Sequence, residues 1–176
     1  MNAHKLEIIN AKLEPCTFVL IQLRPKEYWP YFDVNNNGYL SLAEVDKGLH
    51  DVIQIPELTA LKPVIIRAFN AAKTVLKAAT KYGDNYVSKA EFKYLLQYLR
   101  QYVNYWHVFD QIDTSGDRRV SRDEFVKAVP LLQQKGMNVS DPQAIFNTID
   151  KNHGGYILFD EFCYYVIENH MDFQED

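Results

Sequence analysis

The sequence has few sulfur-containing residues and no long apolar segment. Its 176 residues include two cysteines and three methionines, and no apolar run is long enough to cross a bilayer. Cys16 and Cys163 lie far apart and lack the spacing of a metal or redox motif, which predicts free thiols in a reducing compartment. The first residues, MNAHKLEIIN, do not have the pattern of a signal peptide. We therefore expect a soluble, cytoplasmic protein.

Several functional classes also lack support in the sequence. The formal net charge is only −4 and no basic cluster is present, so nucleic acid is not expected as a partner. No nucleophile motif, phosphate-binding loop or zinc-type spacing occurs, which predicts that the chain is not an enzyme. Hydrophobic residues make up 47% of the chain and aromatic residues 14%, as expected for a globular protein with a substantial core.

The most informative stretch is DVNNNGYLSLAE, residues 33–44, in which oxygen-bearing side chains alternate around one glycine. Ca2+ is a hard cation that takes about six to eight oxygen ligands. A helix-flanked loop of this kind supplies them from positions 1, 3, 5, 7, 9 and 12, with a backbone carbonyl at position 7 and water at position 9. The predicted ligands of this first loop are Asp33, Asn35, Asn37, the carbonyl of Tyr39, and Glu44, with Ser41 at position 9. Gly38 at position 6 allows the left-handed turn, and a set with two acids predicts weaker binding than four acids would give.

The apolar residues that flank this loop recur three more times along the chain. The four frames start at residues 33, 80, 113 and 150, and their members are Trp29, Phe32, Leu40, Val45 and Leu49; Leu76, Ala79, Val87, Phe92 and Leu96; Phe109, Ile112, Val120, Phe125 and Val129; and Phe146, Ile149, Ile157, Phe162 and Val166. One match alone would be compatible with an Asn-Gly surface turn. A repeat of helix, loop and helix instead predicts an all-α fold with four EF-hand helix-loop-helix units in two packed pairs. Within the pairs, Val87 should face Leu40 and Val120 should face Ile157.

The third and fourth loops also carry candidate ligands. In DTSGDRRVSRDE these are Asp113, Ser115, Asp117, the carbonyl of Arg119, and Glu124. Arg118 occupies the glycine position, where a non-glycine residue costs about 1–2 kcal/mol, and we still expect binding. In DKNHGGYILFDE the candidates are Asp150, Asn152, the carbonyl of Tyr156, and Glu161. Gly154 leaves position 5 of this loop without a side chain. The side chains of the fourth loop are therefore equally compatible with calcium binding and with a purely structural role.

The second loop, TKYGDNYVSKAE, has lost most of the ligand pattern. Thr80 replaces the first aspartate, Tyr82 the position-3 ligand and Asn85 the glycine. Asp84 and Glu91 are too few for tight calcium binding, whereas the apolar frame is kept. We therefore expect the second hand to be a structural partner of the first.

The remaining segments predict the domain organisation. Leu6, Ile9 and Leu13 follow a helical period, so residues 1–24 are expected to form a helical extension. The two EF-hand pairs should cover residues 25–103 and 104–176. Residues 88–112 contain no glycine or proline, which indicates a long helix between the pairs. Pro130 falls inside the exit helix of the third hand and should kink it. Asp141 and Pro142 should cap and begin the next helix.

The second half resembles the flagellar calcium-binding proteins, or calflagins, of protists. The resemblance lies in VFDQIDTSGDRRVSRDEFVKAVPLL and DPQAIFNTIDKNHGGYILFDEF, together with SLAEVDKGL after the first loop. It implies a calcium sensor that changes its conformation and its association with a membrane or partner, in a cilium or flagellum. It also implies that the C-terminal pair binds calcium, which favours the third and fourth loops. Calflagins are acylated at an N-terminal glycine, whereas this chain begins Met1-Asn2, so this form of membrane attachment is not expected.

Three functions are compatible with these observations. The leading hypothesis is a monomeric calcium sensor that binds two to three Ca2+ ions and then engages a protein or membrane-associated target. A calcium buffer of the sarcoplasmic type is an alternative, for which tight sites also filled by Mg2+ would speak. A calcium-triggered photoprotein is the third, because that class also has a defective second hand.

Overall fold

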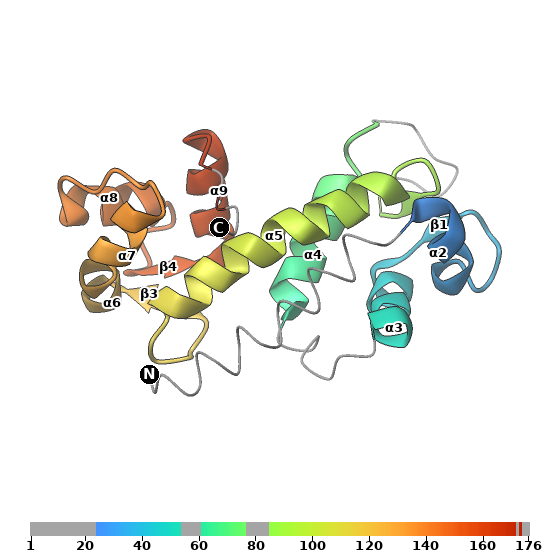
Figure 1. The fold of residues 1–176 in the computed structure, drawn as a ribbon, viewed down its shortest axis with the longest axis horizontal. Coiled ribbons are helices and arrows are strands. Elements are labelled where there is room, and N and C mark those ends of the chain that lie inside the picture. Colours follow the sequence, from blue (N-terminus) through green and yellow to red (C-terminus); the bar gives the residue numbers. More distant parts are fainter. Residues whose placement is uncertain (1–23, 54–60, 77–84, 172, 174–176) are drawn as a thin grey trace. The chain divides into compact units, whose positions relative to one another are not determined.

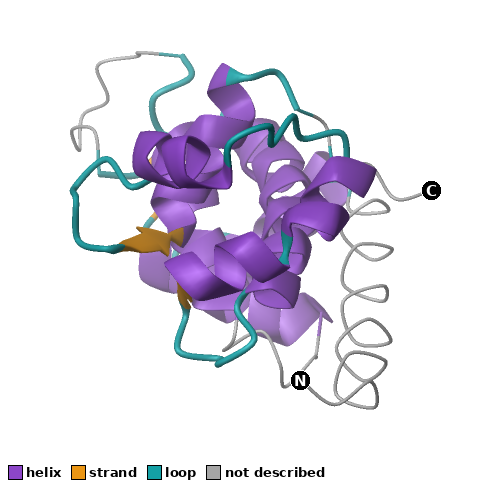
Figure 2. Ribbon diagram, turned by 90° about the vertical axis from the view of Figure 1, so that its left-hand side faces the viewer, coloured by secondary structure: helices purple, strands orange, loops and turns teal. Residues whose placement is uncertain are grey.

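The computed structural model describes residues 24–53, 61–76, 85–171 and 173. Helices dominate these residues, and the strands are short (Figures 1 and 2). The elements are α2 (Pro25–Phe32), β1 (Tyr39–Leu40), α3 (Leu42–Ile53), α4 (Lys62–Ala72), β2 (Val87–Ser88), α5 (Phe92–Ile112), β3 (Arg119–Ser121), α6 (Arg122–Lys127), α7 (Val129–Gln134), α8 (Pro142–Ile149), β4 (Tyr156–Leu158) and α9 (Phe159–Glu168). Outside the described residues lie residues 1–23 of the predicted N-terminal extension, which include Cys16, and residues Ala79, Thr80, Tyr82 and Asp84 of the second hand.

The described residues divide into two compact units between Val103 and Asn104. Helix α5 is continuous through this point and has 21 residues. The long helix predicted from the absence of glycine and proline is therefore confirmed. Its tyrosines and tryptophan belong mainly to the core, since Tyr102, Tyr105 and Trp106 are each buried.

The first unit is built around a two-stranded antiparallel ladder. Leu40 of β1 pairs with Val87 of β2, and both side chains are completely buried, as predicted. Trp29 and Phe32 of α2 both meet the ring of Phe92 edge-on, at centroid distances of 5.2 and 4.9 Å. This aromatic cluster joins the entering helix of the first hand to the exit helix of the second.

The close approach of α3 to α2 depends on a glycine. A β-carbon at Gly48 would lie 2.4 Å from Cδ1 of Phe32. Phe32 is completely buried, so its ring has no free space into which it could move. Gly48 therefore lets the exit helix of the first hand pack directly on the aromatic core.

The apolar frame of the second hand differs from its prediction at Leu76. Helix α4 ends at Ala72, and Leu76 lies beyond it with 43% of its surface exposed. The hydroxyl of Thr74 donates to the carbonyl of Ala71 at 3.0 Å, a local bond that competes with continuation of the helix. The buried face of α4 instead consists of Val64, Ile65, Ala68, Phe69 and Ala72.

The second unit repeats the same design. Val120 of β3 pairs with Ile157 of β4 in an antiparallel ladder, again as predicted. Its core is aromatic: Phe109 contacts Phe159 and Phe162 at 5.5 and 5.7 Å. The paired helix-loop-helix units in both halves confirm the predicted fold class.

The predicted helix cap is present in this unit, and the exit helix predicted to kink at Pro130 is divided into two helices. Helix α6 ends at Lys127, and α7 begins at Val129 with Pro130 in its first turn. Asp141 caps α8, because its side chain accepts hydrogen bonds from the N–H groups of Gln143 and Ala144. Val129 is only half-buried, contrary to the predicted frame, because the break before α7 gives the core position to Leu132, which is fully buried.

Candidate metal-binding loops

Each of the first, third and fourth loops begins with a buried aspartate. Asp33, Asp113 and Asp150 expose only 3–4% of their surface. In every case Oδ2 accepts a hydrogen bond from the backbone N–H at loop position 6, donated by Gly38 at 3.1 Å, Arg118 at 2.7 Å and Gly155 at 2.9 Å. A buried carboxylate needs such donors. The loop backbone is therefore wound around its first candidate ligand.

This winding needs left-handed backbone at two positions of each loop. Position 6 has φ values of 81° at Gly38, 65° at Arg118 and 80° at Gly155, and position 4 has 54° at Asn36, 74° at Gly116 and 56° at His153. Arg118 thus adopts the conformation of the glycine that it replaces. In this conformation its N–H donates to Asp113 as the glycines of the other two loops donate to their aspartates.

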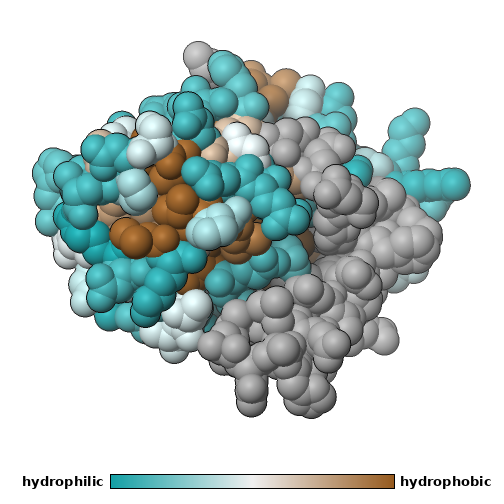
Figure 3. Space-filling view, turned by 60° about the vertical axis from the view of Figure 1, so that its left-hand side comes forward, coloured by the Kyte–Doolittle hydropathy of each residue, from teal (hydrophilic) through white to brown (hydrophobic). Residues whose placement is uncertain are grey.

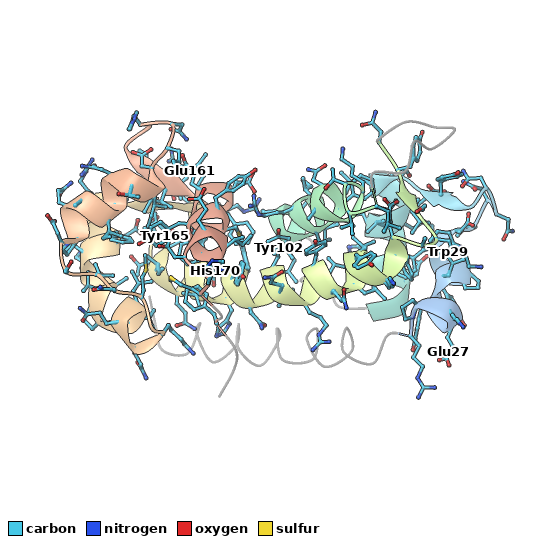
Figure 4. All side chains as sticks on the ribbon, turned by 90° about the horizontal axis from the view of Figure 1, so that it is seen from above. Glu27, Trp29, Tyr102, Glu161, Tyr165 and His170 are labelled. Carbon is cyan, nitrogen blue, oxygen red and sulfur yellow. The ribbon has the colours of Figure 1, made fainter. Side chains whose placement is uncertain are left out.

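The glutamate at position 12, at the C-terminal end of each of the three loops, accepts hydrogen bonds from two other loop positions. Oε2 of each accepts from the backbone N–H at position 9, donated by Ser41 at 2.8 Å, Ser121 at 2.9 Å and Leu158 at 2.9 Å. Oε1 accepts from the residue at position 3, through Nδ2 of Asn35 at 2.5 Å, the N–H of Ser115 at 2.9 Å and the N–H of Asn152 at 3.1 Å. Each glutamate lies in the first turn of an exit helix, as Figure 4 shows for Glu161 on α9.

The charge of Glu124 is stabilised by the loop around it. Burial of this side chain is the largest single influence and raises its pKa. Hydrogen bonds from the N–H and hydroxyl of Ser121, the N–H of Ser115 and the hydroxyl of Thr114 together outweigh it and lower the pKa to about 2. Glu124 is therefore an anion at neutral pH and available to a cation.

The asparagine side chains at positions 3 and 5 accept hydrogen bonds from backbone N–H groups of their own loop. Asn35 accepts from the N–H of Asn37 at 2.9 Å, and Asn37 accepts from the N–H of Tyr39 at 2.8 Å. In the fourth loop Asn152 accepts from Gly154 at 2.7 Å. Tyr39, Arg119 and Tyr156, whose carbonyls are the predicted position-7 ligands, each begin a strand.

The predicted ligands of the third loop differ in the partners of their side chains. Ser115 donates its hydroxyl to Oδ1 of Asp113 at 3.1 Å, and Ser115 and Glu124 are hydrogen-bonded. Asp117 instead accepts two hydrogen bonds from the guanidinium of Arg119, at 2.8 and 3.2 Å. Among the described residues, no three His, Cys, Asp or Glu side chains gather as a group that could hold a metal ion. The third loop has the most predicted ligand acids, and one of them, Asp117, is ion-paired with Arg119.

Sequence reasoning predicted Trp29 as a core residue and missed its hydrogen bond to a predicted ligand. Its indole Nε1 donates to Oδ2 of Asp33 at 3.1 Å. The signal was available in the sequence, because residues four apart on a helix lie on one face, and Trp29 precedes Asp33 by this interval.

The second hand keeps the closing glutamate. Glu91 exposes only 1% of its surface, and its Oε2 accepts from the N–H and the hydroxyl of Ser88 at 2.9 and 2.7 Å. These are the same bonds that Ser41 and Ser121 make in the other loops. Glu91 therefore fixes the strand β2 to the start of α5, and the structural role of this hand stays a prediction.

The chemistry of the donor groups fits a hard divalent cation. The predicted ligands in the first, third and fourth loops are carboxylate, amide, hydroxyl and carbonyl oxygens, and none of them is histidine or cysteine. The buried aspartate and the closing glutamate approach each loop from opposite ends. Helix-loop-helix units joined in pairs by a short ladder define the EF-hand class of calcium-binding proteins.

Comparison with known proteins places the chain within that class. The sequence model of the FCaBP EF-hand domain matches residues 20–99, and that of the EF-hand domain pair matches residues 104–167. A flagellar calcium-binding protein of Trypanosoma cruzi is 34% identical over 152 residues, which cover 85% of this chain and 72% of that protein. Flagellar calcium-binding protein TB-17 of Trypanosoma brucei brucei is 30% identical, with 85% of this chain and 65% of that protein covered. The chain belongs to the flagellar calcium-binding protein family.

The family assignment confirms the resemblance to calflagins. A homolog of programmed cell death 6 protein from Leishmania major Friedlin also has a similar structure, with 20% identity, a TM-score of 0.41, and coverage of 83% of this chain and 72% of that one. Within the described residues, no helix has the length and apolar character needed to span a membrane.

Proposed function

We propose that this protein is a calcium sensor that uses the first, third and fourth loops to change the orientation of its exit helices. The ligands are the oxygen-bearing groups predicted from the sequence at positions 1, 3, 5, 7 and 12 of these loops, except position 5 of the fourth loop, which is a glycine. The second hand serves as a structural partner of the first. These oxygen ligands would hold Ca2+, whose positive charge would be neutralised in part by the aspartate and glutamate of each loop. The protein then presents an apolar surface to a protein target.

One observation carries this proposal: each closing glutamate connects a loop directly to the core. Glu124 reaches position 3 of its loop, and the next residue, Phe125, is 1% exposed and meets the ring of Phe146 at 5.8 Å. Glu161 is likewise followed by Phe162, which packs on Phe109. A displacement of the glutamate therefore moves the first turn of the exit helix and the aromatic ring attached to it.

The flagellum is the proposed location. The relatives are named flagellar calcium-binding proteins, and this supports a role for the chain in that organelle. A chain tagged at its C-terminus and imaged in a flagellated cell would be expected along the flagellum. A signal spread evenly through the cell body would speak against this location.

The sensor proposal is tested by the binding of an apolar dye such as ANS, with and without calcium, in millimolar magnesium. A sensor should bind more dye after calcium is added, because helix reorientation uncovers apolar surface. The Glu161→Gln variant should show a smaller increase, and Glu91→Gln should behave as the unchanged protein. No change of dye binding in the unchanged protein would favour a calcium buffer.

A further inference from the structure

We propose that Arg119 sets the calcium affinity of the third loop by competing with the cation for Asp117. This inference rests on the proposed calcium binding by the third loop. It assigns to Arg119 a role for its side chain, in addition to the backbone carbonyl at position 7. The ligand concerned is a divalent cation, and the competing group is a guanidinium of the same loop.

The geometry of the pair is that of a two-point ion pair. Nη2 of Arg119 donates to Oδ2 of Asp117 at 2.8 Å, and Nε donates to the same oxygen at 3.2 Å. The backbone N–H of Arg119 donates to the other oxygen, Oδ1, at 2.9 Å. Both carboxylate oxygens at position 5 are therefore engaged by one residue two positions further along the loop.

Arg119 is held in this place by the neighbouring loop. The guanidinium carbon lies 4.4 Å from the centre of the ring of Tyr156. In the β3–β4 ladder Arg119 is opposite Leu158 and Ser121 is opposite Tyr156, so Arg119 and Tyr156 are diagonal neighbours on one face of the ladder. A cation over an aromatic ring is attracted by the ring, which pre-orders the arginine for its contact with Asp117.

The arrangement is specific to the third loop. Position 5 is an uncharged asparagine, Asn37, in the first loop and a glycine, Gly154, in the fourth. Asp117 is thus the one acid at position 5 among these three loops, and it is the acid that is neutralised. The loop with the largest number of ligand acids has its affinity reduced by an internal counter-ion.

The expected size of the effect is modest. The side chains of Arg119 and Asp117 are 47% and 38% exposed, and water screens the interaction between such groups. Exposed ion pairs of this kind change an equilibrium by about two- to fivefold. Replacement of Arg119 should therefore tighten binding within this range.

The experiment is a calcium titration of the full chain, followed at the third loop by the backbone amide signal of Gly116. Arg119→Gln should lower the half-saturating calcium concentration at Gly116 by about two- to fivefold. Arg118→Gln is the matched control, since it removes the same charge from the adjacent residue and keeps a β-carbon at the left-handed position. It should change the half-saturating concentration clearly less. In the Asp117→Asn background, Arg119→Gln should have no further tightening effect.

A second readout follows the arginine itself. The Nε–Hε signal of Arg119 should move when calcium saturates Gly116 in the unchanged protein, because Asp117 leaves the guanidinium. Equal tightening by Arg119→Gln and Arg118→Gln, or no tightening by Arg119→Gln, would overturn the inference while leaving the proposed function intact. If the Gly116 amide signal does not shift with calcium even in the unchanged protein, the proposed calcium binding by the third loop is wrong. The inference about Arg119 then fails with it.

Discussion

The indole Nε1 of Trp29 donates a hydrogen bond to Oδ2 of Asp33 at 3.1 Å. Both residues are nearly completely buried, at 5% and 4% exposure. The bond links the last turn of the helix that enters the first hand to the first predicted ligand of its loop. A core residue and a ligand residue are thus parts of one contact, and a change at either should be measurable at the other.

Trp29→Phe keeps an aromatic ring in the core but removes the N–H donor to Asp33 together with part of the ring volume. A buried carboxylate that loses such a donor is destabilised, so the free energy of unfolding without calcium should fall by roughly 2 kcal/mol. Urea denaturation in the presence of a chelator measures this value. Trp106→Phe is the control, because Trp106 makes ring contacts with Phe109 and Phe159. An equal loss in the two variants would show that ring size, and not the hydrogen bond, matters.

The closing glutamates should separate the binding loops from the structural hand. Glu44→Gln, Glu124→Gln and Glu161→Gln should each reduce the number of bound calcium ions by one, because the amide replaces a charged carboxylate that can bind through two oxygens. Glu91→Gln should leave this number unchanged. Isothermal titration calorimetry of the four variants measures the stoichiometry. A loss of one ion in Glu91→Gln would contradict the structural role of the second hand.

Gly48→Ala should destabilise the first unit although alanine favours helices by about 1 kcal/mol over glycine. The new β-carbon would overlap the ring of Phe32, and overpacking of this kind costs about 1–3 kcal/mol. Thermal unfolding should show the lower stability. His50→Ala on the exposed side of the same helix is the control and should change stability by less than about 0.5 kcal/mol. A Gly48→Ala protein that is more stable than the unchanged chain would show that Phe32 can move.

Arg118→Gly should stabilise the calcium-free protein by about 1 kcal/mol. Arg118 has a φ of 65°, which costs a residue with a β-carbon about 1–2 kcal/mol, and the greater freedom of glycine in the unfolded chain offsets part of the gain. Arg118→Ala removes the same charge but keeps the β-carbon, so urea denaturation should show no comparable gain. Equal stabilisation by both substitutions would assign the effect to charge rather than to backbone strain.

The repeat of apolar residues predicted the fold because each position has one geometric role. Residues such as Leu40 and Val120 stand at loop position 8, and their pairing with Val87 and Ile157 follows from the way two loops meet. The continuous helix α5 and the cap at Asp141 follow from local chemistry. The helix and the cap depend on residues close together in the chain, and the pairings depend on a repeat of one pattern, so the sequence shows both directly.

The features that sequence reasoning missed depend on competition between partners. Leu76 fits the apolar frame, but the end of α4 at Ala72 leaves it exposed. Asp117 fits the ligand pattern, yet the nearest cation is the side chain of Arg119. The spacing of oxygen-bearing residues in a loop predicts which groups can bind a cation. It does not predict what these groups contact when no cation is bound. The ligand set of the three loops stays a prediction.

Backbone amide NMR during a calcium titration in millimolar magnesium tests most directly whether calcium changes the conformation of the core as well as that of the loops. We expect shifts that begin in the three loops and extend to Val45, Phe125 and Phe162 and into helix α5. Shifts confined to the loop residues, or loops already saturated by magnesium before calcium is added, would contradict this expectation and identify the protein as a calcium buffer.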